Sequence, residues 1–238
     1  MDEVTSTSDI VAQRARAGGP EGLCVIAARQ TAGRGRRGRG FFSPASGLYM
    51  SVLLRPCVPA DDAQMTTVAA AVAAAEAIEA LSGRETRIKW VNDILIEGRK
   101  VCGILTESDI VDGRIAHSVL GIGVDIEEPE GGFPAEIAAV AGAVFPRGGG
   151  DRLRLAEEIL NRFFAYYERL REREYMPAYR SRSSVLGRTV TILGEGGGPV
   201  EAVAIDDDAA LIVRTGSGEL RRLFAGEVSV RTEQAEDD

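Results

Sequence analysis

The sequence has 238 residues, of which 45% are apolar and 27% charged; these proportions exclude a disordered or fibrous chain, and the length fits one large domain or a main domain with a smaller one. Its longest apolar run covers only residues 68–75, far short of the ~20 residues of a membrane span, and residues 1–20 carry no apolar secretion signal, so we expect a cytoplasmic protein that binds no membrane. A net charge of −8 argues against a general nucleic-acid binder.

Three elements are predicted in the first third of the chain. Residues 23–28 (LCVIAA) and 48–55 (LYMSVLLR) are short apolar runs typical of buried strands. Residues 65–81 are rich in alanine, contain no Gly or Pro, and lie between an acidic pair and a Ser-Gly pair, which are common helix start and stop signals. We therefore expect two strands followed by one long buried helix.

A group of neighbouring strands is predicted next, over residues 88–96, 101–107 and 115–126. Gly98 and an Asp-Gly pair supply the turns between them, since glycine adopts the backbone conformations that tight hairpins need. A helix followed by a meander of strands indicates an α+β fold with a mixed or mostly antiparallel sheet.

A long loop and a second helix follow this meander. Residues 127–150 are rich in Gly, Pro and Ala and are predicted as a loop with one helical turn near Ile137. Loops of this length inside compact domains are usually functional. Asp151 is expected to cap a helix that runs to about Arg173, with one apolar stripe made of Leu153, Ala156, Leu160, Phe163, Tyr167 and Leu170.

The last part of the chain changes character and is predicted as a small separate domain. Short β-prone runs are separated by turns rich in Gly and Asp; they cover residues 189–193, 200–205, 210–214, 220–224 and 228–231. Such a series predicts an SH3-like β-barrel. We therefore divide the chain into a main domain over residues 1–183, the barrel over residues 184–232 and an acidic tail over residues 233–238.

The three cysteines, Cys24, Cys57 and Cys102, are widely spaced and form no Cys-x-x-Cys pair. The sequence therefore predicts neither a disulfide framework nor a zinc site. We interpret all three as small buried apolar residues.

The most distinctive feature is a loop rich in Gly and Arg after the first predicted strand, with the sequence QTAGRGRRGRG at residues 30–40. No Asp or Glu occurs over residues 22–60, which carry a charge of +6, while the rest of the chain carries −14. Glycines let backbone N–H groups turn toward a ligand, and arginines supply positive charge for a carboxylate or phosphate. The loop predicts a site for a small anion, with a flexible RGG-type nucleic-acid segment as the alternative.

Lysine is scarce in this chain, where Lys89 and Lys100 are the two lysines among 28 basic residues. They belong to KWVND at residues 89–93 and RKVCGIL at residues 99–105. Lysine is a compact charge for a phosphate, the Asn carboxamide can bind a purine edge, and Asp can hold Mg²⁺. These residue types indicate a nucleotide site, with a solvated hairpin that turns at Asn-Asp as the alternative.

Together, the two segments resemble the biotin protein ligase family, in the monofunctional form named biotin–[acetyl-CoA-carboxylase] ligase. The resemblance covers nearly the whole chain and includes Ser6-Thr7, GRGRRGR, SPASGLYMSVLLRP, KWVND, RKVCGILTE, GIGVDI and GEVSVR. It implies a class II synthetase-like catalytic domain of α+β type and a small C-terminal SH3-like barrel. It also implies an enzyme that activates biotin with ATP to biotinyl-5′-adenylate and transfers the biotin to a lysine of a carrier domain.

The resemblance implies a role for each matching residue. Biotin would be held by Ser6, Thr7, Gln30, Gly33, Arg34, Lys100 and Gly103. ATP would be held by Arg36, Arg39, Asn92, Lys100, Gly123 and Arg231, with Asn92 reading adenine and Asp93 near Mg²⁺. Catalysis would rest on the charges of Lys100, Arg36 and Arg39 between the biotin carboxylate and the α-phosphate. Gly123 can equally serve packing, and Arg231 can equally be a surface charge.

The sequence departs from the family pattern at several positions. Ser8 replaces the Asn of Ser-Thr-Asn, Val91 replaces the Pro of KWPND, and Phe41 or Phe42 replaces a Trp. Asp125 replaces the Asn of GIGVN and adds an anion near a phosphate site, unless it binds magnesium or points away. The long loop also lacks the usual Ala-Thr-Ser-Leu element.

The implied partner is the biotin carboxyl carrier domain of acetyl-CoA carboxylase or of a related biotin-dependent carboxylase. The protein would act as a monomer or weak homodimer. Because the sequence leaves no room before Ser6 for the winged helix-turn-helix domain of bifunctional members, we expect no DNA binding. Two other functions stay open: a lipoate or octanoyl ligase of the same fold, and an RGG-type nucleic-acid-binding module.

Overall fold

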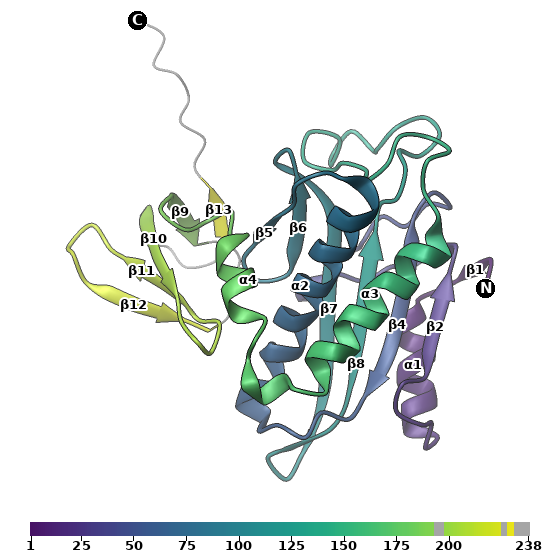
Figure 1. Ribbon diagram of the computed structural model, residues 1–238, viewed down its shortest axis with the longest axis horizontal. Helices are drawn as coiled ribbons and strands as arrows, with labels where there is room; N and C mark the ends of the chain where they lie inside the picture. Colours follow the sequence, from purple (N-terminus) through teal and green to yellow (C-terminus); the bar gives the residue numbers. More distant parts are fainter. Residues whose placement is uncertain (193–197, 225–227, 231–238) are drawn as a thin grey trace, which may run out of the picture.

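A six-stranded antiparallel sheet organises the main part of the molecule (Figure 1). The structure is a computed structural model that describes residues 1–192, 198–224 and 228–230. The sheet order is β2-β4-β8-β7-β6-β5, and its strands are β2 (Cys24–Ala27), β4 (Leu48–Leu54), β5 (Arg87–Lys89), β6 (Asp93–Ile96), β7 (Arg99–Val111) and β8 (Arg114–Val124). The predicted α+β fold class is confirmed.

The two faces of this sheet are covered differently, because successive side chains of a strand point to opposite faces. The helices α2 (Ala63–Ser82) and α3 (Arg152–Tyr167) pack on one face, over a core that includes Met50, Val52, Cys102, Ile104, Leu120 and Ile122. On the opposite face, α1 (Thr7–Arg16) places Val11 and Ala15 against Leu53 and Val119. Part of this second face stays open and holds the site described below.

The predicted alanine-rich helix is confirmed as α2, which ends at Gly83 with a left-handed φ of 68°. The segment Ala60–Ser82 is long and apolar enough to cross a membrane by composition, yet 67% of its apolar window is buried inside the protein. The burial identifies α2 as a core helix, packed on the sheet beside α3 (Figure 1).

The predicted cap of the next helix is also confirmed, since the Asp151 carboxylate accepts hydrogen bonds from the N–H groups of Leu153 and Arg154, both at 3.0 Å. Two details were wrong. Leu153 is 68% exposed, and α3 ends at Tyr167 rather than near Arg173. Arg173, beyond the helix end, has a left-handed φ of 56°, and its guanidinium binds Asp62 and Asp208, so ion pairs to distant residues hold the turn there.

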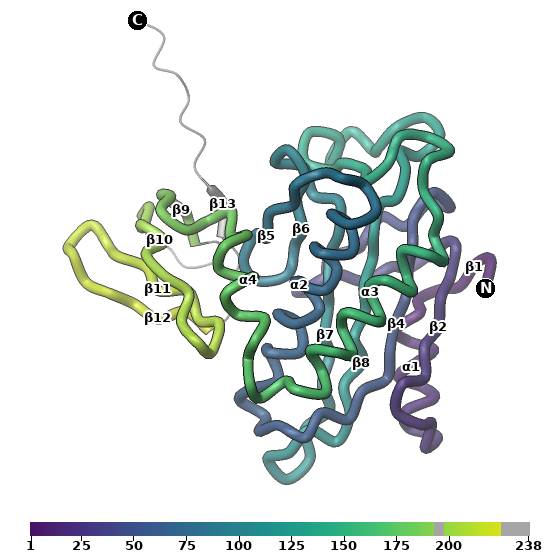
Figure 2. The backbone as a smooth tube through the Cα atoms, viewed as in Figure 1, coloured from purple at the N-terminus to yellow at the C-terminus, as the bar shows by residue number. Residues whose placement is uncertain are grey.

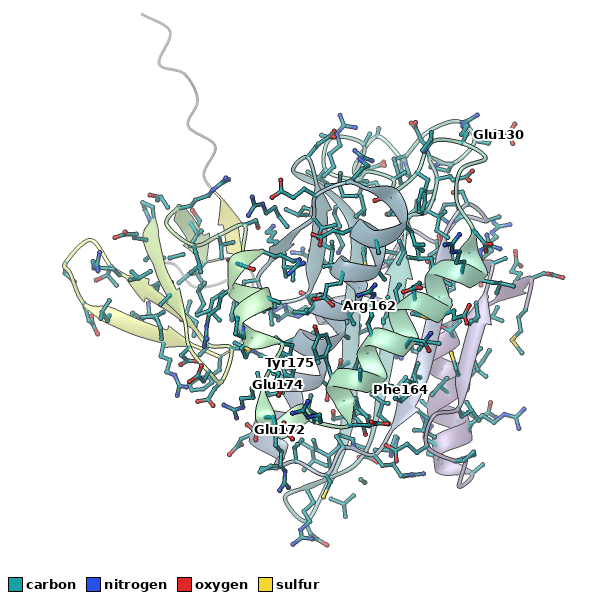
Figure 3. The ribbon with its side chains drawn as sticks, viewed as in Figure 1. Glu130, Arg162, Phe164, Glu172, Glu174 and Tyr175 are labelled. Carbon is teal, nitrogen blue, oxygen red and sulfur yellow. The ribbon has the colours of Figure 1, made fainter. Side chains whose placement is uncertain are left out.

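The segment after α3 turns back toward α2 through α4 (Met176–Ser181), a helix that the sequence analysis missed. Tyr175 precedes α4 and packs edge-on against Tyr166 of α3, with ring centroids 5.8 Å apart. Figure 3 shows Tyr175 beside the lower turns of α2, and Arg162 at the α3 surface that faces α2. These contacts hold α3 and α4 to the core helix.

The predicted strand over residues 88–96 is wrong in one respect, because it is a hairpin of β5 and β6 with a turn at residues 90–92. The Trp90 indole N–H donates to the Ala209 carbonyl at 2.9 Å, and the Val91 carbonyl accepts from the Tyr179 hydroxyl at 3.0 Å. These partners lie far away in sequence and hold the turn against the core, where the side chains of Trp90 and Val91 are buried. The peptide bond between Trp90 and Val91 is cis. The KWVND motif therefore lies on a tight turn.

Two short elements near the N-terminus were not predicted. β1 (Glu3–Val4) pairs in parallel with β3 (Arg29–Gln30), outside the main sheet. This pairing brings the start of α1 next to the Gly- and Arg-rich loop. The cysteine interpretation also needs correction: Cys102 is buried, whereas Cys24 and Cys57 lie on strand and loop positions open to solvent.

The predicted loop over residues 127–150 is confirmed, with its helical turn at Ile137, whose N–H donates to the Pro134 carbonyl at 2.9 Å. Glu130 marks the outer part of this loop in Figure 3. The inner part runs beside β7, where the Lys100 N–H donates to the Val140 carbonyl at 2.7 Å. The loop therefore supports the backbone at Lys100.

The C-terminal strands form a second antiparallel sheet with the order β12-β11-β10-β9-β13. They are β9 (Thr189–Ile192), β10 (Val200–Ile205), β11 (Leu211–Arg214), β12 (Leu220–Leu223) and β13 (Val228–Val230), which confirms the predicted series of short strands. Figure 2 shows this sheet beside α4 and β5. Arg231 and the tail at residues 233–238 lie outside the described residues, and the domain limits at residues 183 and 232 stay predictions.

Candidate functional site

A cavity on the open face of the main sheet collects most of the predicted site residues. It is lined by the start of α1, the Gly- and Arg-rich loop and five strands of the main sheet, and it brings together Ser6, Thr7, Gln30, Arg34, Arg36, Arg39, Asn92, Asp93, Lys100, Gly103 and Gly123. Gly33 lies in the adjoining loop, where a Cβ would come within 2.4 Å of the Ser43 hydroxyl. Close packing of the loop base therefore explains this glycine.

The floor of the cavity is a row of residues that face one another across five strands. In the strand registers, Lys89 pairs with Asp93, Asp93 with Gly103, Gly103 with Gly123, and Gly123 with Tyr49. Directly opposite residues share one face of the sheet at about 5 Å between Cβ atoms. The row therefore places two charged side chains at one end and an aromatic ring at the other.

The two glycines of this row leave space that the ring of Phe41 enters. A Cβ at Gly123 would lie 2.6 Å from the Phe41 ring, and a Cβ at Gly103 would lie 3.0 Å from it. Of the two phenylalanines that stand after the loop, Phe41 thus faces the cavity, whereas Phe42 is 42% exposed. In this structure both glycines serve close packing of the loop on the sheet.

The deep end of the cavity is polar but uncharged. The Thr7 hydroxyl lies 2.8 Å from the Ser51 hydroxyl and 3.1 Å from Oε1 of Gln30, to which it donates. The Ser8 hydroxyl lies 3.0 Å from that of Ser51, and Ser6 is buried beside them. This network of hydroxyl and amide groups can donate and accept hydrogen bonds to a neutral polar ligand.

Lys100 reaches the cavity because of an irregularity in β7. Ile94 pairs with Cys102, whereas the next residue of β6, Leu95, pairs with Lys100, so Val101 is one extra residue on β7. Without this bulge the alternation of the strand would point Lys100 into the helix-covered core. Bulges of this kind commonly turn a side chain toward an active site.

The Lys100 ammonium is held by two groups of the cavity. Its Nζ lies 2.7 Å from Oδ1 of Asp93 and 5.5 Å from the centroid of the Phe41 ring, a cation–π distance. The ion pair balances the charge of the Asp93 carboxylate. Lys100 and Asp93 therefore act as one unit, which an incoming anion must rearrange.

Asp125 comes directly after β8, its N–H donates to the Val101 carbonyl at 2.8 Å, and it is 8% exposed. Burial raises the pKa of this carboxyl to about 7, against the opposing effect of the nearby Lys100 ammonium. Asp125 is not among the described residues that line the cavity. Near neutral pH, burial thus keeps part of the Asp125 carboxyl protonated, so it adds less negative charge to the site than an ordinary Asp would.

The Gly- and Arg-rich loop is folded across the cavity and anchored on both sides. On one side the Arg34 guanidinium lies 2.5 Å from Glu107 and 3.2 Å from Asp9. On the other, Arg36 donates to Oδ1 of Asn92 at 2.9 Å. Only the backbone of Arg34 can therefore serve a ligand in this arrangement, and the anchored loop differs from a flexible RGG segment.

The side-chain carboxamide of Asn92 makes two hydrogen bonds to the described residues and keeps the capacity for two more. Its Nδ2 donates to the Ile104 carbonyl at 2.7 Å, and its Oδ1 accepts from Arg36. A carboxamide has two N–H donors and two acceptor lone pairs. One donor and one lone pair are thus left for a purine edge, which is what the predicted adenine contact needs.

Sequence reasoning assigned no site role to several polar residues that line the cavity, among them Ser8, Tyr49, Ser51 and Lys89. The alternation of residues 48–55 contains the signal for two of them, because Tyr49 and Ser51 interrupt the apolar face on alternate positions. The scarcity of lysine singled out Lys89 without assigning it a role.

Within the described part of the chain, no three His, Cys, Asp or Glu residues cluster as metal ligands.

Comparisons with known proteins point to one family. Residues 2–125 match the model of the biotin/lipoate A/B protein ligase family, and residues 185–231 match the biotin protein ligase C-terminal domain. The chain is 33% identical to the bifunctional ligase/repressor BirA of Bacillus spizizenii, over 97% of this chain and 73% of that protein. It is 32% identical to biotin–[acetyl-CoA-carboxylase] ligase of Mycobacterium tuberculosis, over 94% and 85%. The solved biotin protein ligase from Aquifex aeolicus in complex with biotin and ATP is similar, with a TM-score of 0.81, 28% identity and 97% coverage of both chains.

Proposed function

Since the chain belongs to the biotin/lipoate A/B protein ligase family, we infer that the cavity described above is the site where biotin is activated and transferred. The protein is a biotin–[acetyl-CoA-carboxylase] ligase, which uses ATP to form biotinyl-5′-adenylate and passes the biotin to a carrier domain of a biotin-dependent carboxylase. The observation that carries the site assignment is the division of the cavity into a neutral polar end and a cationic end.

The neutral end suits the ureido ring of biotin, which presents one carbonyl acceptor and two N–H donors. Thr7 and Ser51 offer hydroxyl groups, and Gln30 offers a carboxamide, within one network of hydrogen bonds. The acyl chain would then pass along the glycine floor beneath Phe41, with backbone groups of Gly33 and Arg34 alongside. Its carboxylate would arrive beside Lys100.

The first half-reaction brings two anions together. An oxygen of the biotin carboxylate attacks the α-phosphorus of ATP, and the bond from that phosphorus to the bridging oxygen of pyrophosphate breaks. Lys100, Arg36 and Arg39 supply positive charge at this end of the cavity, so they stabilise the charge that the attack concentrates there. Arg231, which the resemblance assigns to the nucleotide, stays a prediction.

The second half-reaction needs no protein nucleophile. The amine of the acceptor lysine attacks the acyl carbon of the adenylate, and AMP leaves with the electrons of the broken bond. The folded loop, anchored at Arg34 and Arg36, covers the reactive anhydride and excludes water. We propose the carrier domain of acetyl-CoA carboxylase as the acceptor and the cytoplasm as the place of the reaction.

Magnesium fits this site only together with ATP. Asp93 is the one acidic residue among the described residues that line the cavity, and its Oδ1 is already paired with Lys100. Mg²⁺ is commonly held by one or two carboxylates and the phosphates of a substrate. Asp93 would hold the ion through its other oxygen, and the ion would offset phosphate charge.

The lipoate alternative is tested by binding. A bicyclic ureido ring matches the hydroxyl network of Thr7 and Ser51, whereas the dithiolane ring of lipoate offers no strong hydrogen-bonding groups to it. We expect isothermal titration to detect biotin binding and to detect none of lipoate. Equal affinity for both acids would contradict the assignment of the neutral end.

We predict that ligand protects the loop at residues 31–42 from proteolysis. Its four arginines repel one another when no anion is present, while Arg34 and Arg36 anchor it to Glu107 and Asn92. Limited trypsin digestion should therefore cut the loop more slowly once biotin and ATP are added. Glu107→Gln, which removes an anchor outside the cavity, should speed cutting of the free protein. Equal rates with and without ligand would contradict the prediction.

Arg36→Gly should release the adenylate. Arg36 anchors the loop to Asn92 over the nucleotide end of the cavity. Removal of this charge-assisted hydrogen bond should raise the rate at which biotinyl-adenylate dissociates by about tenfold to hundredfold. Escaped biotinyl-adenylate would label lysines of bystander proteins, which a biotin blot detects. The control is Arg29→Gly, which removes an exposed arginine of β3 that pairs with Glu3 of β1. If the Arg36→Gly variant labelled bystander proteins no more than the wild type does, Arg36 would not retain the adenylate.

A further inference from the structure

Lys89 lies at the edge of the same cavity and has no role in the site assigned above. It is half-buried on β5 and lines the cavity together with Lys100. Among the described residues, the ammonium of Lys89 has neither an ion-pair partner nor a hydrogen bond. Lys100 differs, because Asp93 balances its charge at 2.7 Å. A half-buried cation without a partner costs free energy unless an anion from outside the protein pairs with it.

The position of Lys89 indicates which anion this is. Lys89 ends the floor row on the β5 side, next to Asp93, whereas Tyr49 ends it on the side of the neutral pocket. β5 is the outer strand of the sheet, beside the C-terminal sheet (Figure 1). A ligand that lies along the floor thus has its neutral ring toward Tyr49 and its charged end toward Lys89.

Phosphoryl chemistry sets the direction of the leaving group along this row. The attacking and leaving oxygens of a phosphoryl transfer lie roughly in line on opposite sides of the phosphorus. Because the biotin carboxylate approaches from the side of Gly123 and reaches the α-phosphate near Lys100, the pyrophosphate must depart on the far side. That side is occupied by Asp93 and Lys89.

We propose that Lys89 is a further catalytic residue, which binds the pyrophosphate leaving group during biotin activation. This inference rests on the proposed function. As the bond to the bridging oxygen breaks, its electron pair stays with pyrophosphate, and the Lys89 ammonium neutralises the added charge without transferring a proton. Lys89 is not needed in the second half-reaction, where AMP is the leaving group and pyrophosphate has gone.

The test separates the two half-reactions in three variants of the full-length protein. Lys89→Met removes the charge, Lys89→Arg keeps a cation, and Arg87→Met is the matched control. Arg87 stands two residues earlier on the same face of β5, is exposed and pairs with Glu85 outside the cavity. The measurements are biotin-dependent exchange of labelled pyrophosphate into ATP, biotin affinity by calorimetry, and transfer to a carrier domain from supplied biotinyl-adenylate.

We expect Lys89→Met to lower kcat/KM for pyrophosphate about tenfold to hundredfold, the usual effect of removing a hydrogen bond to a charged group. Biotin affinity and transfer from supplied adenylate should stay at the wild-type level, Lys89→Arg should recover part of the loss, and Arg87→Met should behave as wild type. An unchanged KM and kcat for pyrophosphate, or an equal loss in all three measurements, would overturn the inference. Wild-type protein without biotin-dependent exchange would instead overturn the proposed function, and the inference with it.

Discussion

Lys100→Arg should lower the rate of biotinyl-adenylate formation by about a hundredfold, although it keeps the positive charge. The Lys100 side chain is confined between Asp93 at 2.7 Å and the Phe41 ring, and it passes over the bare Cα of Gly103. A guanidinium is larger, planar and fixed in its hydrogen-bond directions, so it cannot take the place of a compact ammonium there. Lys100→Ala should be slower still, because both anionic reactants lose their partner.

The two half-reactions distinguish this role from a general loss of structure. Only the first must bring a carboxylate and a triphosphate together, so transfer from supplied biotinyl-adenylate should suffer much less than pyrophosphate exchange in both variants. Arg99→Ala is the control, since Arg99 is the exposed neighbour of Lys100 on β7. Normal exchange by Lys100→Arg would show that Lys100 is a surface residue of the hairpin.

Asp125→Asn should stabilise the protein at pH 8 by about 4 kcal/mol, the free-energy equivalent of the pKa shift of this carboxyl. Burial raises its pKa from 3.8 to about 7 in the folded protein. Between these two pKa values the folded protein keeps a proton that the unfolded chain has released. The contribution of this carboxyl to the free energy of unfolding therefore falls as the pH rises from about 4 to 7, and it is constant above pH 7. Asn resembles the protonated carboxyl and avoids this loss.

The difference between variant and wild type should therefore grow with pH. Urea unfolding should give a gain of less than about 2 kcal/mol at pH 5 and the full gain at pH 8. Asp2→Asn, at an exposed acidic position, is the control and should show no such change. An equal gain for Asp125→Asn at both pH values would mean that the carboxyl titrates as in the unfolded chain.

Local patterns predicted the elements whose cause is local. The alanine-rich composition of α2, the apolar run of β4 and the turn residues between the C-terminal strands act over a few positions, so each was found within a few residues of its bounds. The cap at Asp151 was predicted for the same reason, because it needs only its own helix. The end of α3 at Tyr167 was missed, and the segment after it is held through Arg173, which pairs with Asp62 and Asp208 far away in sequence.

The candidate site shows the same division. The residue types of the Gly- and Arg-rich loop, KWVND and RKVCGIL indicated an anion and nucleotide site, and the resemblance supplied the roles. Neither indicated that an extra residue at Val101 turns Lys100 toward the cavity, or that the Arg34 side chain binds Glu107 instead of a ligand. Both features depend on strand register and on partners far away in sequence. The floor row from Lys89 to Tyr49 is likewise a property of the register.

Biotin-dependent exchange of labelled pyrophosphate into ATP tests the central claim most directly, because it requires the first half-reaction and no acceptor protein. The proposed site predicts exchange that depends on biotin, is not supported by lipoate, and falls about a hundredfold in Lys100→Arg. Exchange without biotin, or none in its presence, would contradict the assignment of this cavity to biotin activation.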